Sequence, residues 1–266
     1  MLPESYRECL EPPATAGLRA GLAHAAEAAA ALVYPPHCLA CGLPLPPMPN
    51  RVLCGGCAER IEWVGADRCT RCGDRVGEGR GSVDGCPSCA AHPPVYVTQS
   101  ATLARYAEPL RALILGLKFG AGLQAVPLLA ALLARRVRDT RLLEGARPLA
   151  AIVPVPLARK DFRARGFNQA EELARDLGRR LSLPVETRML RKVRATSPQA
   201  TLDADARREN LRGAFEAAPR EAARYMPSAV LLLDDVITTG STIGECARTL
   251  RQAGVAEVRA AAVARG

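Results

Sequence analysis

Residues 229–242 read Ala-Val-Leu-Leu-Leu-Asp-Asp-Val-Ile-Thr-Thr-Gly-Ser-Thr, and the rest of the chain can be placed around this stretch. The run 229–233 is apolar at every position, which predicts a central strand of a parallel sheet, buried on both faces. Asp234 and Asp235 end the run, a turn of small and hydroxylic residues follows, and residues 243–250 have the pattern of an amphipathic helix. Because the N–H groups of such a turn and the positive end of a helix attract anions, the stretch predicts a phosphate-binding loop.

The two adjacent acids indicate that the ligand carries more than a phosphate, because a phosphate alone would not need carboxylates beside it. Adjacent residues of a strand face opposite sides of a sheet, but at a strand end the chain is already turning and both carboxylates can border one crevice. A phosphorylated ribose fits this arrangement, with its phosphate in the loop and its hydroxyls on Asp234 and Asp235. The alternative is purely structural: a buried strand followed by a helix that Thr239 or Ser241 caps.

Residues 234–242 resemble the 5-phosphoribosyl 1-pyrophosphate (PRPP) motif of type I phosphoribosyltransferases. The resemblance implies that Asp234 and Asp235 bind the ribose hydroxyls and, in a catalyst, face the positive charge that develops at the anomeric carbon. It also implies Mg²⁺ bound with the diphosphate and ribose oxygens. The residues implied for the 5-phosphate are Thr238, Thr239, Gly240, Ser241 and Thr242.

A second apolar segment, residues 149–156, predicts another buried strand, and a basic loop follows it. Strands that alternate with helices predict an α/β fold with a parallel sheet, whose ligands bind beyond the carboxyl ends of the strands. The loops 154–169 and 236–242 should therefore border one crevice. The basic residues are Arg159 and Lys160, expected on the pyrophosphate side, and Arg163 and Arg165, expected on a diphosphate or a DNA backbone. The alternative is a solvated charged loop without a function.

The spacing of apolar residues predicts the remaining helices and strands. The expected helices are 16–33, 107–117, 123–137, 169–181 and 202–211, and the expected strands are 95–106, 185–190, 213–216 and 257–263.

Eight of the ten cysteines form four Cys-x-x-Cys pairs. Each pair can direct two thiolates at one ion, so two pairs complete a tetrahedral Cys₄ site with no open position, which indicates structural zinc. The simplest grouping is sequential, with Cys38, Cys41, Cys54 and Cys57 at one ion and Cys69, Cys72, Cys86 and Cys89 at the other. Spacing leaves a crossed grouping open, and disulfides are an alternative that a cytoplasmic location disfavours.

The Cys-x-x-Cys pairs, the Arg-Gly-Phe-Asn-Gln run at 165–169 and the PRPP-like motif together resemble the ComF family. Prolines near the N-terminus and the Ala-rich pattern that follows predict a loose segment and helix at 1–36. The resemblance implies a double zinc ribbon at 37–94 and a type I phosphoribosyltransferase-like domain at 95–266. It implies a role in DNA uptake during natural transformation or in the use of DNA-derived nucleotides, with Mg²⁺-dependent phosphoribosyl transfer as the candidate reaction. The alternative is a non-catalytic adaptor that senses PRPP or a nucleotide and binds single-stranded DNA.

The charge is unevenly distributed along the chain. The net charge is +9; residues 1–36 carry two Arg and four Glu, and residues 37–95 carry six Arg and six acids, which places a surplus of +11 in 96–266. A basic domain favours phosphate-rich ligands or nucleic acid, whereas neutral ribbons favour docking of partner proteins. No stretch has the length and apolarity of a membrane span or the pattern of a signal peptide, so we expect a cytoplasmic protein without membrane insertion.

Overall fold

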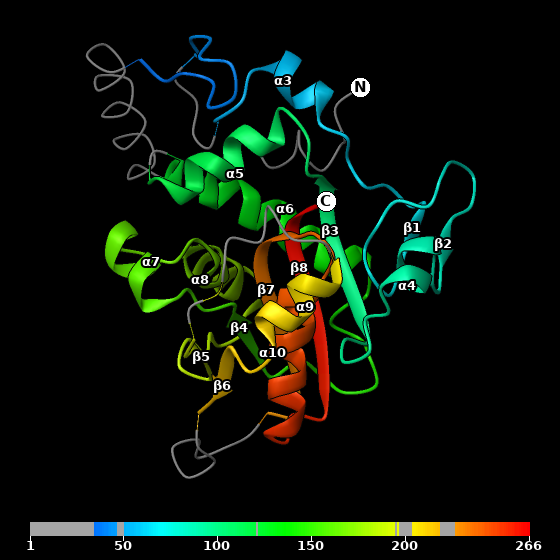
Figure 1. Ribbon diagram of the computed structural model, residues 1–266. Helices are drawn as coiled ribbons and strands as arrows, with labels where there is room; N and C mark the ends of the chain where they lie inside the picture. The colour runs from blue at the N-terminus through cyan, green and yellow to red at the C-terminus, as the bar shows by residue number, and fades with distance from the viewer. Residues whose placement is uncertain (1–34, 47–50, 121, 195, 197–203, 219–226) are drawn as a thin grey trace.

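The computed structural model describes residues 35–46, 51–120, 122–194, 196, 204–218 and 227–266 (Figure 1). The helix expected over 16–33 lies outside the described residues. Among the described residues, no helix is both long enough and apolar enough to cross a bilayer.

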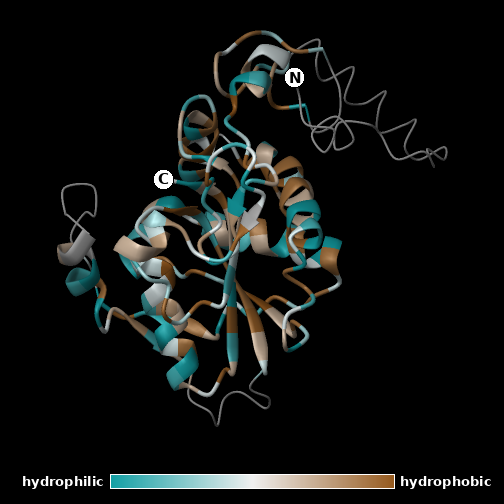
Figure 2. Cartoon of the chain, turned by 90° about the vertical axis from the view of Figure 1, so that its right-hand side faces the viewer, coloured by the Kyte–Doolittle hydropathy of each residue, from teal (hydrophilic) through white to brown (hydrophobic). Residues whose placement is uncertain are grey.

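A four-stranded parallel sheet forms the centre of the molecule. Its strands lie in the order β3 (Gln99–Arg105), β8 (Glu257–Arg265), β7 (Ala229–Ile237) and β4 (Ala151–Pro154). The two apolar runs predicted as buried strands are β7 and β4, and the predicted parallel α/β fold is confirmed. Figure 2 shows hydrophobic residues gathered in the central strands.

Helices cover both faces of this sheet. Helices α6 (Val126–Asp139) and α8 (Gln169–Leu181) pack on one face, and α10 (Ser241–Gln252) packs on the other. Side chains of β7 alternate between the two cores. Leu231 and Leu233 belong to the core with α6 and α8, while Val230 and Leu232 belong to the core with α10. This alternation decides where the two acids of β7 point.

Shorter elements surround the sheet. The α6 face also carries α5 (Leu110–Lys118) and the 3₁₀ turn η1 (Leu123–Ala125). On the other side, α9 (Ala204–Leu211) contacts α10, and β5 (Leu190–Lys192) pairs antiparallel with β6 (Phe215–Ala217).

The strand predicted over 185–190 is wrong. Val185 makes a single parallel bridge to Ile152, a turn follows at Thr187 and Arg188, and β5 begins only at Leu190. The four-residue strand β4 is already paired with β7 on its other side, and the turn carries the chain away before a second residue can pair.

The segment predicted as a basic loop contains a helix, α7 (Arg159–Arg165). Its arginines and lysine are good helix formers, and Gly166 ends the helix in the left-handed conformation with φ of 80°. None of the seven residues is buried. The helix therefore presents its basic side chains to solvent beside the end of β4.

The first zinc ribbon contains α3 (Gly55–Arg60) and is continuous with the main core. Leu53, Ala58 and Ile61 pack in the same cluster as α5 and α6. Beyond this ribbon, Val64 N–H donates to the carbonyl of Leu103 over 2.8 Å, so the chain runs antiparallel along β3. This pairing covers an edge that would otherwise expose unpaired backbone groups.

The second ribbon contains β1 (Arg68–Cys69), β2 (Ser82–Val83) and α4 (Pro87–Ala91), and it lies beside β3 (Figure 1). Its apolar contacts form a small cluster of their own around its cysteines. The two ribbons therefore differ in how deeply they join the rest of the protein.

Candidate functional site

Asp234 and Asp235 lie inside β7, because the strand continues to Ile237. The expectation that the chain already turns at the acids is therefore wrong. The pairing with β8 skips Asp235 and resumes in the same register at Val236, so the side chains of the two acids still point to opposite faces of the sheet. The shorter β4 ends opposite Leu233, so the acids border the space beyond its carboxyl end.

Asp235 is buried on the α6 and α8 face and has three partners. One carboxylate oxygen lies 3.4 Å from Lys118 Nζ and accepts a hydrogen bond of 3.3 Å from Gln169 Nε2. The other oxygen accepts from the N–H of Val236 over 2.9 Å. This carboxylate is held in place by groups from three separate elements.

Sequence reasoning did not assign roles to Lys118 and Gln169. A sequence signal existed for each: Lys118 ends an amphipathic helix before a Gly-x-Gly turn, and Gln169 follows directly on Asn168. The Asn168 side chain caps α8 by accepting from the N–H of Ala170 at 3.0 Å, and it donates to the carbonyl of Val155 at 2.9 Å. Asn168 thereby fixes the start of α8 beside the end of β4, which brings Gln169 to Asp235.

Asp234 occupies the opposite face and has a different environment. Burial raises its pKa well above the ordinary value for aspartate, and the neighbouring negative charge of Asp235 raises it further. On this face the charge of Asp234 acts on Cys246 of α10 and on Lys192 of β5. The two acids therefore offer a ligand two chemically different carboxyl groups.

The loop 238–242 joins β7 to α10 with Gly240 at the N-cap. Gly240 has φ of 80°, a conformation that L side chains rarely adopt, and a Cβ added at this residue would meet no atom within 4 Å. The helix has no side-chain cap; Thr239 Oγ1 lies 2.8 Å from Ser241 Oγ and makes only a 3.4 Å contact with Ser241 N–H. The alternative of a Thr or Ser cap is therefore wrong, and the first helical turn presents N–H groups that have no carbonyl partner in the helix.

The other members of the loop lie at its two ends. Thr238 is exposed, and its carbonyl accepts a hydrogen bond from the guanidinium of Arg265 at the end of β8. Thr242 lies half-buried in the first turn of α10.

The structure divides the four basic residues of α7 differently from the sequence prediction. Arg159 and Arg163 lie one helical turn apart and line a cavity of about 230 Å³ together with Phe162. Lys160 is exposed and is not part of this lining, so the expected pair of Arg159 and Lys160 does not share one site. Arg165 donates to Gln169 Oε1 over 3.2 Å, which connects it through Gln169 to Asp235.

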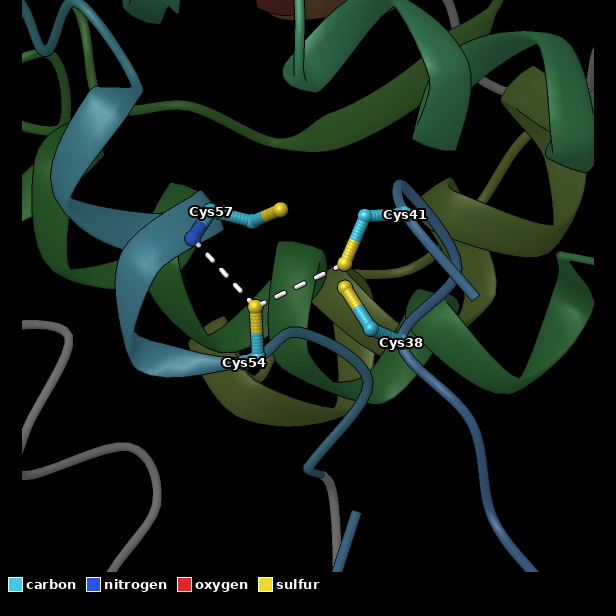
Figure 3. A group of neighbouring side chains, drawn as sticks. All are labelled: Cys38, Cys41, Cys54 and Cys57. Atoms are coloured by element: carbon cyan, nitrogen blue, oxygen red, sulfur yellow. Dashed lines mark hydrogen bonds between the residues drawn. The ribbon is translucent and has the colours of Figure 1, made fainter. Parts of the chain in front are cut away.

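The eight cysteines gather into two groups whose sulfurs all lie within 4.8 Å of one another. In the first group, drawn in Figure 3, the sulfurs of Cys41 and Cys54 are 3.7 Å apart. In the second group the sulfurs of Cys69 and Cys89 are 3.6 Å apart. A tetrahedron with zinc–sulfur bonds of about 2.3 Å has edges of about 3.8 Å. Both groups fit structural zinc, and they follow the sequential and not the crossed grouping.

The first zinc site carries an added positive charge. Arg60 donates to Cys57 Sγ over 3.3 Å, and Cys54 Sγ accepts from the N–H of Cys57 over 3.4 Å. Four thiolates around a divalent ion leave a net charge of about −2. Arg60 offsets part of that charge.

Comparison with known proteins identifies both parts of the chain. Residues 29–90 match the double zinc ribbon domain, and residues 163–266 match the phosphoribosyl transferase domain. The chain is 34% identical to competence protein F of Haemophilus influenzae over 213 residues, which cover 80% of this chain and 90% of that protein. It is 33% identical to the DNA utilization protein YhgH of Escherichia coli K12 over 228 residues, which cover 86% of this chain and 96% of that protein. The chain therefore belongs to the ComF family, the proteins in which a double zinc ribbon precedes a phosphoribosyltransferase-like domain.

Proposed function

We propose that the protein binds PRPP, with the 5-phosphate at the loop 238–242 and the ribose hydroxyls at Asp234 and Asp235. One observation carries this proposal: Asp235, held between Lys118 and Gln169, lies three residues before the loop 238–242, in which left-handed Gly240 turns the chain into the N-terminus of α10. A carboxylate for hydroxyls and a loop for a phosphate lie at the same end of the sheet.

The diphosphate of PRPP would bind to the basic side chains nearby. Lys118 is the cation that the structure places against the acid pair, and Arg159 and Arg163 line the cavity beyond the end of β4. On binding, Lys118 would give up its single contact with Asp235 and contact the diphosphate, which carries more negative charge. Both oxygens of Asp235 already accept hydrogen bonds, so the acid pair fits a hydrated Mg²⁺ better than a directly bound one. Mg²⁺, when bound, neutralises the diphosphate.

The candidate reaction is transfer of the phosphoribosyl group to a nucleobase or related acceptor. The bond from the anomeric carbon to the diphosphate oxygen breaks, the leaving pyrophosphate keeps the electron pair, and a nitrogen of the acceptor forms the new bond. Positive charge that develops on the ribose would face the carboxylate of Asp235, which Lys118 and Gln169 hold in place. The names of the two relatives concern competence and DNA utilization, so we place this chemistry in the use of bases or nucleotides derived from DNA, in the cytoplasm.

Calorimetric titration of PRPP, with and without Mg²⁺, tests the proposal. Asp235→Asn should lower the affinity about tenfold or more, because a charge-assisted hydrogen bond to the ribose is lost. The matched control is Asp139→Asn, the same change at an exposed residue of α6, which should leave the affinity unchanged. Absence of PRPP binding by the wild-type protein would contradict the proposal. Pyrophosphate release across a panel of nucleobases then separates a transferase from a protein that only binds PRPP.

A second function has its own support in α7. This helix has no buried residue, it carries four basic side chains, and Phe162 is 45% exposed among them. Basic residues beside an exposed aromatic ring are the components of single-strand binding, in which bases stack and phosphates are neutralised. An adaptor that binds single-stranded DNA through α7, with PRPP as its regulator, is therefore the alternative to an enzyme.

A further inference from the structure

A second cavity, of about 310 Å³, lies on the α10 side of the phosphate loop. Its walls come from the connector 92–97 after the second ribbon, from the C-terminal part of α9, from the first turns of α10 and from the end of β8. It shares Thr239, Gly240 and Ser241 with the phosphate loop, but its lining does not include the acid pair or Lys118. This cavity is therefore separate from the crevice in which Asp235 lies.

Arg265 is the most deeply buried charge in this lining. It is only 7% exposed, and its Nη1 donates to the carbonyls of Ile237 and Thr238. Its Nε is buried without a hydrogen-bond partner, and none of the described carboxylates pairs with the guanidinium. A buried guanidinium is always charged, and burial without a counter-ion is unfavourable. An anion bound in the cavity would supply the missing negative charge.

The rest of the charged lining also favours an anion. The lining contains Arg208, Arg212, Arg248 and Arg265 against a single acid, Glu245. Glu245 is already engaged by Arg248, with contacts of 2.8 and 2.6 Å. Arg208 lies 2.8 Å from His92 Nδ1, and because a guanidinium can only donate, this nitrogen accepts and the ring is not the source of an added charge.

The apolar part of the lining carries an aromatic ring. It is formed by Pro93, Pro94, Val95, Tyr96, Val97 and Ile243. Tyr96 is 41% exposed, so its ring remains accessible. An exposed aromatic ring and several arginines in one cavity match a ligand with a planar apolar part and a phosphate. The volume lies at the low end of the range for small-molecule sites, roughly 300 Å³ upwards, which suits one nucleotide and not a long strand.

We propose that this cavity binds a nucleotide through its 5′-phosphate and its base, either as a free mononucleotide or as the terminal nucleotide of a DNA strand. The phosphate lies against Arg265 and the wall formed by Thr239 to Ser241, and the base stacks on Tyr96. Because the wall is shared, such a nucleotide and the 5-phosphate of PRPP compete for the loop; this competition rests on the proposed function, whereas the binding itself does not.

Titration of the full-length, zinc-loaded protein with deoxyadenosine 5′-monophosphate (dAMP) tests the proposal. Tyr96→Ala should weaken dAMP binding about tenfold, since stacking on the ring is lost, and Tyr96→Phe should restore it. Arg212→Glu should weaken binding several-fold. The matched control is Arg251→Glu, the same charge reversal on the exposed last turn of α10, which should leave dAMP binding unchanged.

Two further arms identify the source of the nucleotide. Deoxyadenosine should bind more weakly than dAMP, because it lacks the phosphate. A short oligodeoxyadenylate with a 5′-phosphate should displace dAMP if the terminal nucleotide of a strand enters the cavity. Failure of the oligonucleotide to displace dAMP assigns the cavity to the free mononucleotide.

The same variants separate this inference from the proposed function. Tyr96→Ala should keep its affinity for PRPP, and Asp235→Asn should keep its affinity for dAMP. If Asp235→Asn lowers the affinity for dAMP and Tyr96→Ala leaves it unchanged, the nucleotide occupies the PRPP crevice and the inference is wrong. Failure of dAMP to bind at all also overturns it. If PRPP does not bind but dAMP binding depends on Tyr96, the proposed function is wrong and the inference holds.

Discussion

At the scale of single residues, the adjacent Asp234 and Asp235 have different environments, because neighbouring residues of β7 point to opposite faces of the sheet. One oxygen of Asp235 lies 3.4 Å from Lys118 Nζ and accepts a hydrogen bond from Gln169. Asp234 faces the α10 core, where burial and the charge of Asp235 raise its pKa. A pair of carboxyl groups of this kind can accept hydrogen bonds at one oxygen and donate one at another, which suits two neighbouring ribose hydroxyls.

The raised pKa of Asp234 predicts a stability effect with a defined sign. Below the ordinary pKa of aspartate the group is protonated in both the folded and unfolded states, so it costs nothing. Above that value the unfolded chain loses the proton while the folded protein keeps it, so stability falls as pH rises towards the folded pKa.

Asp234→Asn should therefore raise the melting temperature of the ligand-free protein at pH 7, and the gain should disappear near pH 4. Thermal unfolding followed by circular dichroism at both pH values measures this effect. Asp139→Asn, on the surface of α6, is the control for the loss of one carboxylate. A lower melting temperature for Asp234→Asn at pH 7 would contradict the raised pKa.

At the scale of elements, sequence patterns predicted correctly those helices that their own capping and apolar residues stabilise. The helix predicted at 169–181 has these bounds in the structure, because Asn168 caps it and its apolar positions repeat with the helical period. Helix α7 was missed because its residues have no apolar face, so periodicity gave no signal. The strand predicted at 185–190 was wrong because strand pairing depends on a distant partner, here the short β4.

Helix α7 gives a prediction that separates DNA binding from PRPP binding. Phe162→Ala should weaken single-stranded DNA binding about tenfold through lost stacking, and Lys160→Glu should weaken it and make it less salt-dependent through a lost phosphate contact. Lys160 neither contacts the acid pair nor lines the cavity with Arg159 and Arg163, so PRPP affinity should persist in the Lys160→Glu variant. Filter binding of an oligonucleotide at several salt concentrations measures the DNA effect.

The control for this charge reversal is Arg251→Glu on the exposed last turn of α10. Equal weakening of DNA binding by Lys160→Glu and Arg251→Glu would show a general charge effect and would remove α7 as the DNA site.

At the scale of the whole molecule, the sequence predicted the parts but not their contacts. Cysteine spacing predicted the two groups of four cysteines, and the apolar run predicted β7. The loops 154–169 and 236–242 were expected to border one crevice, but they line two different cavities. The contact of Lys118 with Asp235 joins two elements far apart in the chain, and no local pattern reports it. The same holds for the first ribbon, whose apolar residues pack against α5 and α6. Such contacts join residues that are far apart in the chain, so no periodicity or motif spacing in the sequence predicts them.

The unequal burial of the ribbons predicts unequal consequences of zinc loss. Cys57 belongs to the core shared with α5 and α6, whereas Cys86 belongs to the edge of a small separate cluster. Zinc binding to such a site is coupled to folding, so losing the first ion should loosen the main core. Cys57→Ser should lower the melting temperature of the main transition by about 10 °C, since each kcal/mol shifts it by roughly 2–4 °C in a domain of this size.

Cys86→Ser should shift the same transition by no more than about 3 °C, because the second ribbon touches the sheet mainly through hydrogen bonds such as Thr102 to the carbonyl of Gly73. Scanning calorimetry together with zinc content by mass spectrometry measures both effects, and each variant should retain one ion. Equal shifts for the two variants would mean that both ribbons stabilise the sheet to the same extent. The predicted difference instead makes the first ribbon a part of the core shared with α5 and α6 and leaves the second ribbon as a separate unit beside β3.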